Sequence, residues 1–286
     1  MIKVTKAAVA SSIQDLGRRG WTWKGHCRSG AMDPACLQLT NRCVGNPAGA
    51  ACIELGPSPF EIQVTKVCVL AFGGAVRSGA PWWEPVEYGP GQSIEVSSPK
   101  EGVWSYLAIQ GGFDMQESFG SRSTCVREGI GRWVRAGDTF TANVPNPKNA
   151  PLPVDPPPMQ GEVRTFGASL MMASDWTIGR RTDRMGYHLD ADHPVGERPA
   201  LELSEPLIPG CIQMLPSGHA IVTMAESPTV GGYAPAGIIH SEDLRLVAQS
   251  KPGDQVRFVF AGYGQERRLG IDQGPVDKKS PFRHTD

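Results

Sequence analysis

The chain lacks the sequence signals that usually mark a membrane span, a secreted protein, a zinc finger or a nucleotide site. It has no run of about 18 apolar residues, and its N-terminus has no long apolar segment of the kind found in secretory signals. None of its seven cysteines stands in a C-x-x-C pair, so we expect free thiols in a reducing cytoplasm and no metal site. Walker, Rossmann and G-x-S-x-G motifs are also missing, which predicts no nucleotide binding by this chain alone.

An excess of charge of one sign is also missing. Lysine and arginine total 28 against 29 acidic residues, which gives a formal net charge of −1. A chain that binds nucleic acid or an anionic membrane surface usually carries a basic excess. We therefore expect neither as a partner.

Glycine and proline, by contrast, are abundant, with 34 and 25 residues. This composition is typical of many short strands joined by turns, so the sequence predicts a mainly β protein. Strands are expected at residues 60–64, 67–72, 93–96, 104–109 and 255–260. One helix is expected after Asp33, with Asp33 as N-cap, Pro34 in the first position and Gly45 as the stop. A second, short helix is expected at residues 242–249.

Prolines also mark the expected domain boundary. Seven of them fall within residues 144–158, a density that cannot continue a sheet interior and favours a stiff, extended linker. We therefore expect an N-terminal domain at 1–145, a linker at 146–159 and a C-terminal domain at 160–286. The Gly-Asp turns at 137–138 and 253–254 each precede an expected closing strand, which indicates either a duplication or a common hairpin device.

The densest polar motif lies at residues 14–33, where glycines alternate with side chains that bind charge. Asp15 and Asp33 accept hydrogen bonds, Arg18 offers a planar fork for a carboxylate, and Ser29 adds a hydroxyl. Glycines let a ligand approach main-chain N–H groups. We expect a binding site here, although Asp33 can equally serve only as a helix cap. The nearby His26 is a candidate acid or base.

Three later motifs add candidates. Arg122 stands among hydroxyls at residues 120–124, a suitable cradle for a carboxylate or a plain polar turn. Arg184 belongs to an arginine-rich segment, and Glu205 is a candidate ion-pair partner for it. Tyr233 follows two glycines, as a pocket wall or a tight turn requires.

The order of these motifs resembles the biotin-dependent carboxyltransferase family, also called allophanate hydrolase subunit 2. It includes the KipA-like C subunit of bacterial ATP-dependent 5-oxoprolinase and is similar to the carboxyltransferase domain of urea carboxylase. The motifs that carry the resemblance run through nearly the whole chain: Q-D-L-G-R at 14–18, S-G-A-M-D at 29–33, V-G-N-P at 44–47, G-S-R-S-T at 120–124, D-R-M-G at 183–186, G-G-Y at 231–233 and P-G-D at 252–254.

The resemblance implies two cyclophilin-like β-barrel domains, a cytoplasmic location, and work beside a KipI-like B subunit and a LamB/YcsF-like A subunit. The chain would bind a small amide or lactam between its domains, with no cofactor of its own, while the assembly uses ATP. The substrate-binding residues expected are Asp15, Arg18, Ser29, Asp33, Arg122, Arg184, Glu205 and Tyr233. No residue is assigned to catalysis itself.

Two other functions fit the same resemblance. One is carboxyl transfer from carboxybiotin to urea or a relative, with biotin supplied by a partner because this chain has no Met-Lys-Met acceptor sequence. The other is a non-enzymatic regulatory partner of a KipI-like protein. The chain departs from the family pattern around Tyr233: Glu226 replaces the usual aspartate, and the usual basic residue after Tyr233 is missing.

Overall fold

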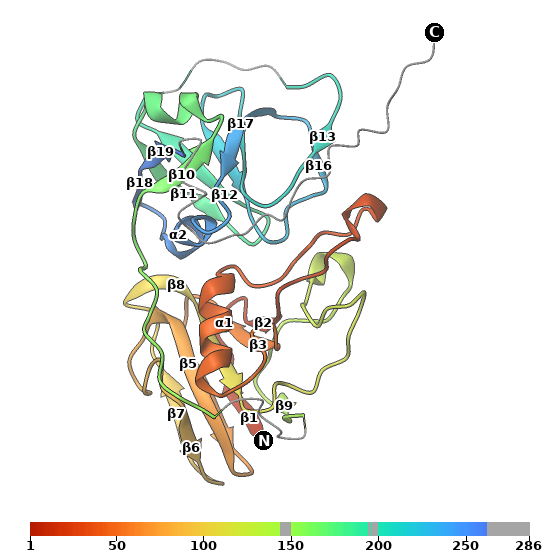
Figure 1. Ribbon diagram of the computed structural model, residues 1–286, viewed down its shortest axis with the longest axis vertical. Helices are drawn as coiled ribbons and strands as arrows, with labels where there is room; N and C mark the ends of the chain where they lie inside the picture. Colours follow the sequence, from red (N-terminus) through yellow and green to blue (C-terminus); the bar gives the residue numbers. More distant parts are fainter. Residues whose placement is uncertain (144–149, 194, 196–199, 262–286) are drawn as a thin grey trace, which may run out of the picture.

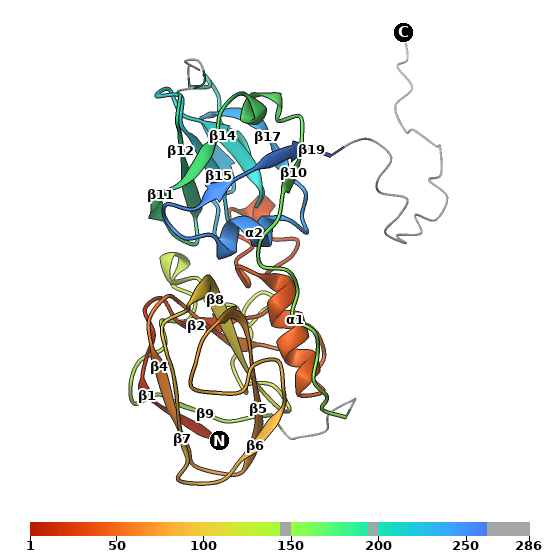
Figure 2. The same cartoon turned by 90° about the vertical axis from the view of Figure 1, so that its left-hand side faces the viewer.

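The computed structural model describes residues 1–143, 150–193, 195 and 200–261, and its regular structure is mostly β-strand. In both views the strands form two groups along the long axis, the N-terminal half (residues 1–143) and the C-terminal half (residues 163–261; Figures 1 and 2). The predicted mainly β fold is confirmed. Within the described ranges, no helix is long and apolar enough to cross a membrane.

Two antiparallel sheets enclose the core of the N-terminal half. One has the order β7-β4-β1-β9 and the other the order β2-β3-β8-β5-β6. Their strands are β1 (Ile2–Lys6), β2 (Ser12–Gln14), β3 (Cys52–Leu55), β4 (Phe60–Val64), β5 (Cys68–Val76), β6 (Val86–Tyr88), β7 (Ser93–Val96), β8 (Glu101–Ile109) and β9 (Thr139–Phe140). Alternate residues of β4 are buried, as expected for a strand with one face toward the core.

The helix α1 (Pro34–Cys43) covers the outer face of the second sheet. Asp33 caps it by accepting a hydrogen bond from Cys36 N at 3.0 Å, and Pro34 begins it, as predicted. Strand β8 is therefore buried on both faces: Leu107 packs in the sheet-to-sheet core, and Tyr106 packs under α1.

The C-terminal half is a nearly closed barrel with the order β18-β11-β12-β15-β14-β17-β10-β19. All neighbouring pairs are antiparallel except β10 with β19. Its strands are β10 (Val163–Phe166), β11 (Trp176–Thr182), β12 (Gly186–Ala191), β14 (Cys211–Met214), β15 (Ala220–Thr223), β17 (Ala234–Ile239), β18 (Gln255–Val256) and β19 (Phe258–Phe260). A separate ribbon pairs β13 (Glu205–Pro206) with β16 (Val230–Gly231). Short 3-10 helices lie at Thr22–Lys24, Val126–Glu128 and Ser169–Ala173.

The strand expected at residues 255–260 is two strands in the structure. It breaks at Arg257, so that β18 pairs with β11 at one edge of the sheet and β19 pairs with β10 at the other. This bend brings the two edges together and nearly closes the barrel. An alternating pattern along one segment cannot reveal that its two ends serve different neighbours.

The two Gly-Asp turns have the same construction. Arg135 N donates to Asp138 Oδ2 and Lys251 N donates to Asp254 Oδ2, each at 2.8 Å. Gly137 N donates to Val4 O of β1, and Gly253 N donates to Ile178 O of β11, each at 2.8 Å. This shared hydrogen-bond pattern is what either a duplication or a common hairpin device would produce.

The two halves share a continuous apolar contact. Val103 and Trp104 of β8 pack into the core of the C-terminal half. The helix α2 (Leu244–Gln249), close to the helix expected at 242–249, lies at the barrel end that faces β8 (Figure 2). Its Gln249 accepts hydrogen bonds from the N–H groups of both Val103 and Trp104, at 2.9 and 3.0 Å.

Part of the predicted linker, residues 144–149, lies outside the described residues. From residue 150 to the start of β10 the chain has neither helix nor strand. It runs beside α1 (Figure 2), where Leu152 N donates to Cys43 O at 3.0 Å and Val154 N donates to Trp83 O at 3.1 Å. The segment is thus bonded to the N-terminal half.

Candidate functional site

The motif at residues 14–33 forms two chain passes that touch through glycine. Gly17 and Gly30 both have positive φ, at 81° and 96°. A Cβ on Gly17 would lie 2.6 Å from Ser29 O, and one on Gly30 would lie 2.9 Å from Gly17 N. Only glycine permits this approach and this backbone conformation together. The two halves of the motif therefore meet.

Asp15 is the centre of a buried hydrogen-bond network. Its Oδ1 accepts from Gly17 N at 2.8 Å and from the hydroxyls of Ser121 and Ser123, both at 2.6 Å. Its Oδ2 accepts from Arg122 N at 2.6 Å. The carboxylate is thus fully occupied within the protein. It joins the opening motif to the residues 120–124 motif.

Ser29 and Arg18 attach to that same second motif. Ser29 Oγ donates to Thr124 O at 2.7 Å, and Arg18 Nη2 donates to Ser123 O. Arg18 is 1% exposed, and within the described part of the chain its Nε and Nη1 have no hydrogen-bond partner. Buried donors without a partner carry a free-energy cost, and Arg18 is not among the residues that line the cavities described below.

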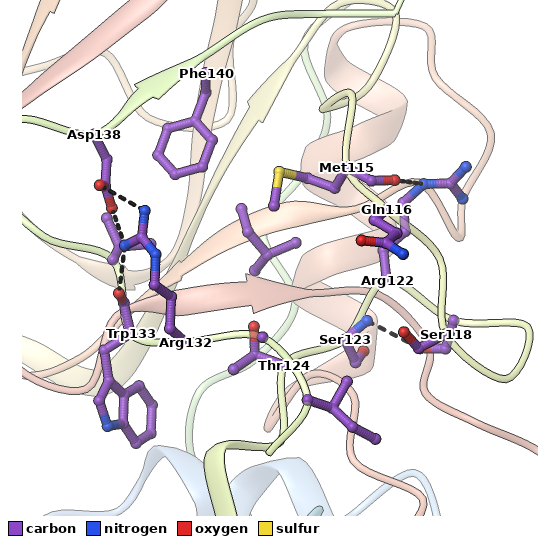
Figure 3. Close-up of a pocket in the computed structure, with 15 residues that line it drawn as sticks. Met115, Gln116, Ser118, Arg122, Ser123, Thr124, Arg132, Trp133, Asp138 and Phe140 are labelled. Atoms are coloured by element: carbon purple, nitrogen blue, oxygen red, sulfur yellow. Dashed lines mark hydrogen bonds and ion pairs between the residues drawn. The ribbon is translucent and has the colours of Figure 1, made fainter. Parts of the chain in front are cut away.

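Arg122 borders a cavity of about 250 Å³ within the N-terminal half (Figure 3). Its Nε donates to Met115 O at 3.1 Å, and its Nη1 lies 3.2 Å from Glu117. Arg132 lines the same cavity, paired with Asp138 at 2.7 Å. Both cations therefore already have acceptors in the protein.

Asp33 does more than cap α1. Its Oδ1 lies 3.1 Å from Arg245 Nε, and its Oδ2 accepts from Gln249 Nε2 at 3.0 Å. Both partners belong to α2 of the other half, and Asp33 is fully buried. The structure therefore places Asp33 in a tie between the halves.

Arg184 forms a second tie. Its Nε donates to Glu226 Oε1 at 2.6 Å, its Nη1 pairs with Glu54 Oε1, and its Nη2 donates to Gly30 O at 2.6 Å. Burial lowers the pKa of Arg184, but Glu54 and Glu226 outweigh that effect and hold its pKa above the usual value. Arg184 therefore stays charged between two buried carboxylates.

Glu205 and Tyr233 lie on the exposed side of the C-terminal half. Glu205 is opposite Gly231 in the β13–β16 ribbon, and Tyr233 O accepts from Gln213 Nε2 at 3.3 Å. Within the described ranges Glu205 makes no ion pair; the acids that pair with Arg184 are Glu54 and Glu226. Tyr233 lines a barrel cavity of about 610 Å³, together with His188.

Two further cavities lie between the halves. The larger, about 510 Å³, is lined by Trp104 and Val126 from one half and by Arg184, Tyr187 and Glu226 from the other. The smaller, which we call the motif cavity, measures about 230 Å³. Its lining residues are Leu16, Arg28, Ser29, Gly30, Ala31, Met32, Pro34, Pro209, Met224, Ala225, Ser241, Leu244 and Arg245.

The motif cavity contains cationic groups and no carboxylate among its lining residues. Arg28 is half-buried, and among the described residues its guanidinium makes no hydrogen bond or ion pair. Burial, followed by the nearby Arg19, lowers the pKa of Arg28. Arg245 is the second cation, although Asp33 already pairs with it at 3.1 Å, and the exposed Ser241 lines the same cavity. This lining suits a small ligand that carries a carboxylate.

The predicted site residues therefore do not converge on one pocket. Asp15, Arg18, Ser29 and Arg122 come together around residues 121–124, but Ser29 alone of the eight lines the motif cavity. Sequence reasoning missed Arg28, although it adjoins Ser29 in the motif. It also missed Arg245, which no pattern near the motif indicates because it comes from the other half.

His26 sits at the edge of the opening motif, away from these cavities' lining. Its Nδ1 lies 3.0 Å from Glu128 Oε2, and its ring is tilted against Phe119 with centroids 4.6 Å apart. This arrangement orients the imidazole toward a carboxylate. A role as acid or base on substrate stays a prediction.

Comparison with known proteins identifies relatives along nearly the whole chain. The proteins named as the C subunit of 5-oxoprolinase from Haemophilus influenzae and Escherichia coli are each 29% identical, over 94% and 96% of this chain and 94% and 95% of their own. A putative urea carboxylase from Emericella nidulans is 26% identical over 90% of this chain, which matches 24% of that protein.

Solved structures agree on the fold. The crystal structure of TTHA0988 is 28% identical with a TM-score of 0.81, covering 90% of this chain and 56% of its own. The K. lactis urea amidolyase has a TM-score of 0.82 at 24% identity, covering 94% of this chain and 19% of its own. The chain thus spans about half the length of the first of these proteins and a fifth of the second.

The match to a family model is equally extensive. The model for the carboxyltransferase domain, subdomain A and B, matches residues 24–260, which include the second chain pass of the opening motif and almost all of the barrel. The chain therefore belongs to the carboxyltransferase domain, subdomain A and B, family.

Proposed function

We propose that this chain is the C-type subunit of an ATP-dependent 5-oxoprolinase-like hydrolase and that it binds a small lactam or amide between its two halves. A KipI-like B subunit and a LamB/YcsF-like A subunit are the partners in this proposal, and the assembly uses ATP. Two relatives named as the C subunit of 5-oxoprolinase, matched along almost their full length, support the assignment.

The observation that carries the proposal is the charge of the motif cavity. Arg28 has no anionic partner among the described residues, and no carboxylate lines the cavity. 5-Oxoproline carries a carboxylate beside its lactam, whereas urea is neutral. A carboxylate on Arg28 would relieve the cost of its partly buried charge. Ser241 lines the same cavity, and its hydroxyl can donate to the lactam oxygen.

The test is reconstitution with the B and A subunits, followed by assay of ATP-dependent 5-oxoproline hydrolysis. R28M should raise KM for 5-oxoproline about tenfold to a hundredfold, because a hydrogen bond to a charged group contributes about 1.5–3 kcal/mol. R19M is the matched control, since Arg19 is exposed and does not line the cavity. Because Arg19 acts on Arg28 only through its charge, R19M should change KM far less than R28M does.

A neutral lactam, 2-pyrrolidinone, separates charge recognition from a general loss of activity. R28M should weaken 5-oxoproline far more than 2-pyrrolidinone. Equal losses for both lactams, or equal effects of R28M and R19M, would reject carboxylate binding at Arg28. No hydrolysis of any lactam with all three subunits present would reject the hydrolase itself.

Carboxyl transfer is the second candidate, favoured by the family match and by the urea carboxylase relative. It requires carboxybiotin on a partner. Affinity purification of the chain from its native cell should then recover a biotinylated protein, and a preparation with none would count against this function. A purely regulatory role would be indicated if R28M left the biological effect and partner binding intact.

A further inference from the structure

Two buried thiols and a carboxylate meet beside the opening motif. Cys27 Sγ and Cys125 Sγ are 3.2 Å apart, and both residues are almost fully buried. A Glu128 carboxylate oxygen completes a group whose ligand atoms all lie within 4.8 Å of one another. Thiolates and carboxylates are the ligands that zinc takes in proteins, usually four in a tetrahedron.

Local backbone structure fixes two of these groups. Cys125 N donates to Ile130 O at 2.8 Å, and Glu128 N donates to Cys125 O at 3.0 Å, so residues 125–130 form a tight turn. This turn brings the side chains of Cys125 and Glu128, three residues apart, toward the same partner. Cys27 arrives from the distant loop, and its own N–H donates to Glu128 Oε1 at 2.7 Å.

The surroundings provide an outer hydrogen-bond partner and a route to solvent. His26 Nδ1 lies 3.0 Å from Glu128 Oε2, and carboxylates that bind metals are commonly held by such a neighbouring group. The His26 and Glu128 side chains are 32% and 17% exposed. An ion can therefore enter on the carboxylate side while the sulfurs stay shielded.

We propose that Cys27, Cys125 and Glu128 bind one zinc ion, with water in the fourth position and His26 holding the carboxylate from outside. With Zn–S bonds of about 2.3 Å, two thiolates of a tetrahedral site lie roughly 3.7 Å apart, so the sulfurs need to separate by only about half an ångström. The ion would link the opening motif, through Cys27, to residues 125–130.

Thiolates, rather than thiols, bind zinc, so metal binding releases the thiol protons. A divalent cation takes the place of both protons and offsets the charge of Glu128.

The direct test is zinc binding to the metal-stripped, reduced chain by equilibrium dialysis. We expect one zinc per chain, retained in C211S, because Cys211 is a partly exposed thiol outside the cluster. C27S and C125S should lose the zinc, and E128Q should bind it more weakly. Cobalt substituted into the wild-type chain should give a sulfur-to-metal absorption band that both serine variants lose.

A measurement on the wild-type chain tests the proposal even if the variants fail to fold. Zinc should slow alkylation of Cys27 and Cys125, mapped by peptide mass spectrometry, without slowing that of Cys211. It should also raise the melting temperature. Absence of both effects, or zinc binding that persists in C27S and C125S, overturns the proposal. A Cys27–Cys125 disulfide in place of zinc, found as a loss of two thiols, would also overturn it and identify a redox pair.

Discussion

Replacing Arg184 with methionine should be among the most destabilising single changes at the interface. Arg184 is the only cation that the structure places between Glu54 and Glu226 in the described residues, and its side chain is 4% exposed. Removing it leaves two buried carboxylates unpaired and takes away the donor to Gly30 O. Breaking a buried ion pair costs about 3–5 kcal/mol, so we expect R184M to lose at least that much.

Replacing Glu54 should cost less stability than replacing Arg184. E54Q leaves Arg184 paired with Glu226, and the glutamine oxygen can still accept from Met32 N and Tyr106 OH, which bond to Glu54 Oε2 at 2.8 and 2.9 Å. We therefore expect E54Q to cost about 1.5–3 kcal/mol, the value of a hydrogen bond to a charged group. E54Q should also partly rescue R184M, because the double variant buries one carboxylate fewer.

Urea denaturation of the four proteins forms a double-mutant cycle that measures this coupling. Lowering the pH from 7 toward 5 provides a second readout. Unpaired buried carboxylates have folded pKa values above their unfolded ones, so their penalty is full at high pH and fades as pH falls. The deficit of R184M should shrink accordingly. A cost below about 1 kcal/mol, or strict additivity with E54Q, would refute the role given to Arg184.

Three further predictions test the parts around this tie. G17A should be more destabilising than G20A by about 1–3 kcal/mol in urea denaturation, because both glycines have φ of 81° but only the Gly17 Cβ meets backbone atoms; equal costs would show that φ alone matters. D15N should lower the free energy of unfolding by about 1–3 kcal/mol, since the new NH₂ group would face a donor whose hydrogen bond the carboxylate now accepts. An unchanged urea midpoint would contradict the hydrogen-bond network around Asp15. Burial raises the pKa of Asp243, but hydrogen bonds from Arg164 at 2.7 Å outweigh this and leave its pKa lowered. The stability it contributes is present above the unfolded pKa near 3.9 and is lost as pH falls through the lower folded value, so D243N should flatten the acid limb of a stability–pH curve.

Local patterns were sufficient for much of the fold. Strands β4 and β7 fall at the predicted residues, and α1 begins at Pro34 after its Asp33 cap, because alternation, capping and proline geometry act over a few residues. The prediction of one strand at residues 255–260 was wrong, because long-range pairing decides the structure of this segment. Its break at Arg257 is imposed by the two sheet edges that it must join.

For the site, the sequence by itself determined the chemistry and the glycine geometry of the opening motif. It predicts a binding site at residues 14–33, since glycines and charged side chains can be identified one by one, and in the structure polar groups gather there around close backbone contacts. Only the tertiary structure decided which groups stay free to act. In the structure Asp15, Asp33 and Arg184 form buried hydrogen bonds and ion pairs within the protein. The Arg28 guanidinium, by contrast, has no partner among the described residues.

The cysteines show the same difference between what the sequence determines and what the tertiary structure decides. Cys27 and Cys125 are 98 residues apart, and Glu128 becomes their neighbour only through the turn after Cys125. Sequence spacing predicts a metal site only when the ligands come from one or two short segments. Here packing of distant loops sets the distances, so the absence of a C-x-x-C pair determined nothing about this cluster. The free energy of the whole fold, rather than any local preference, places the three groups together.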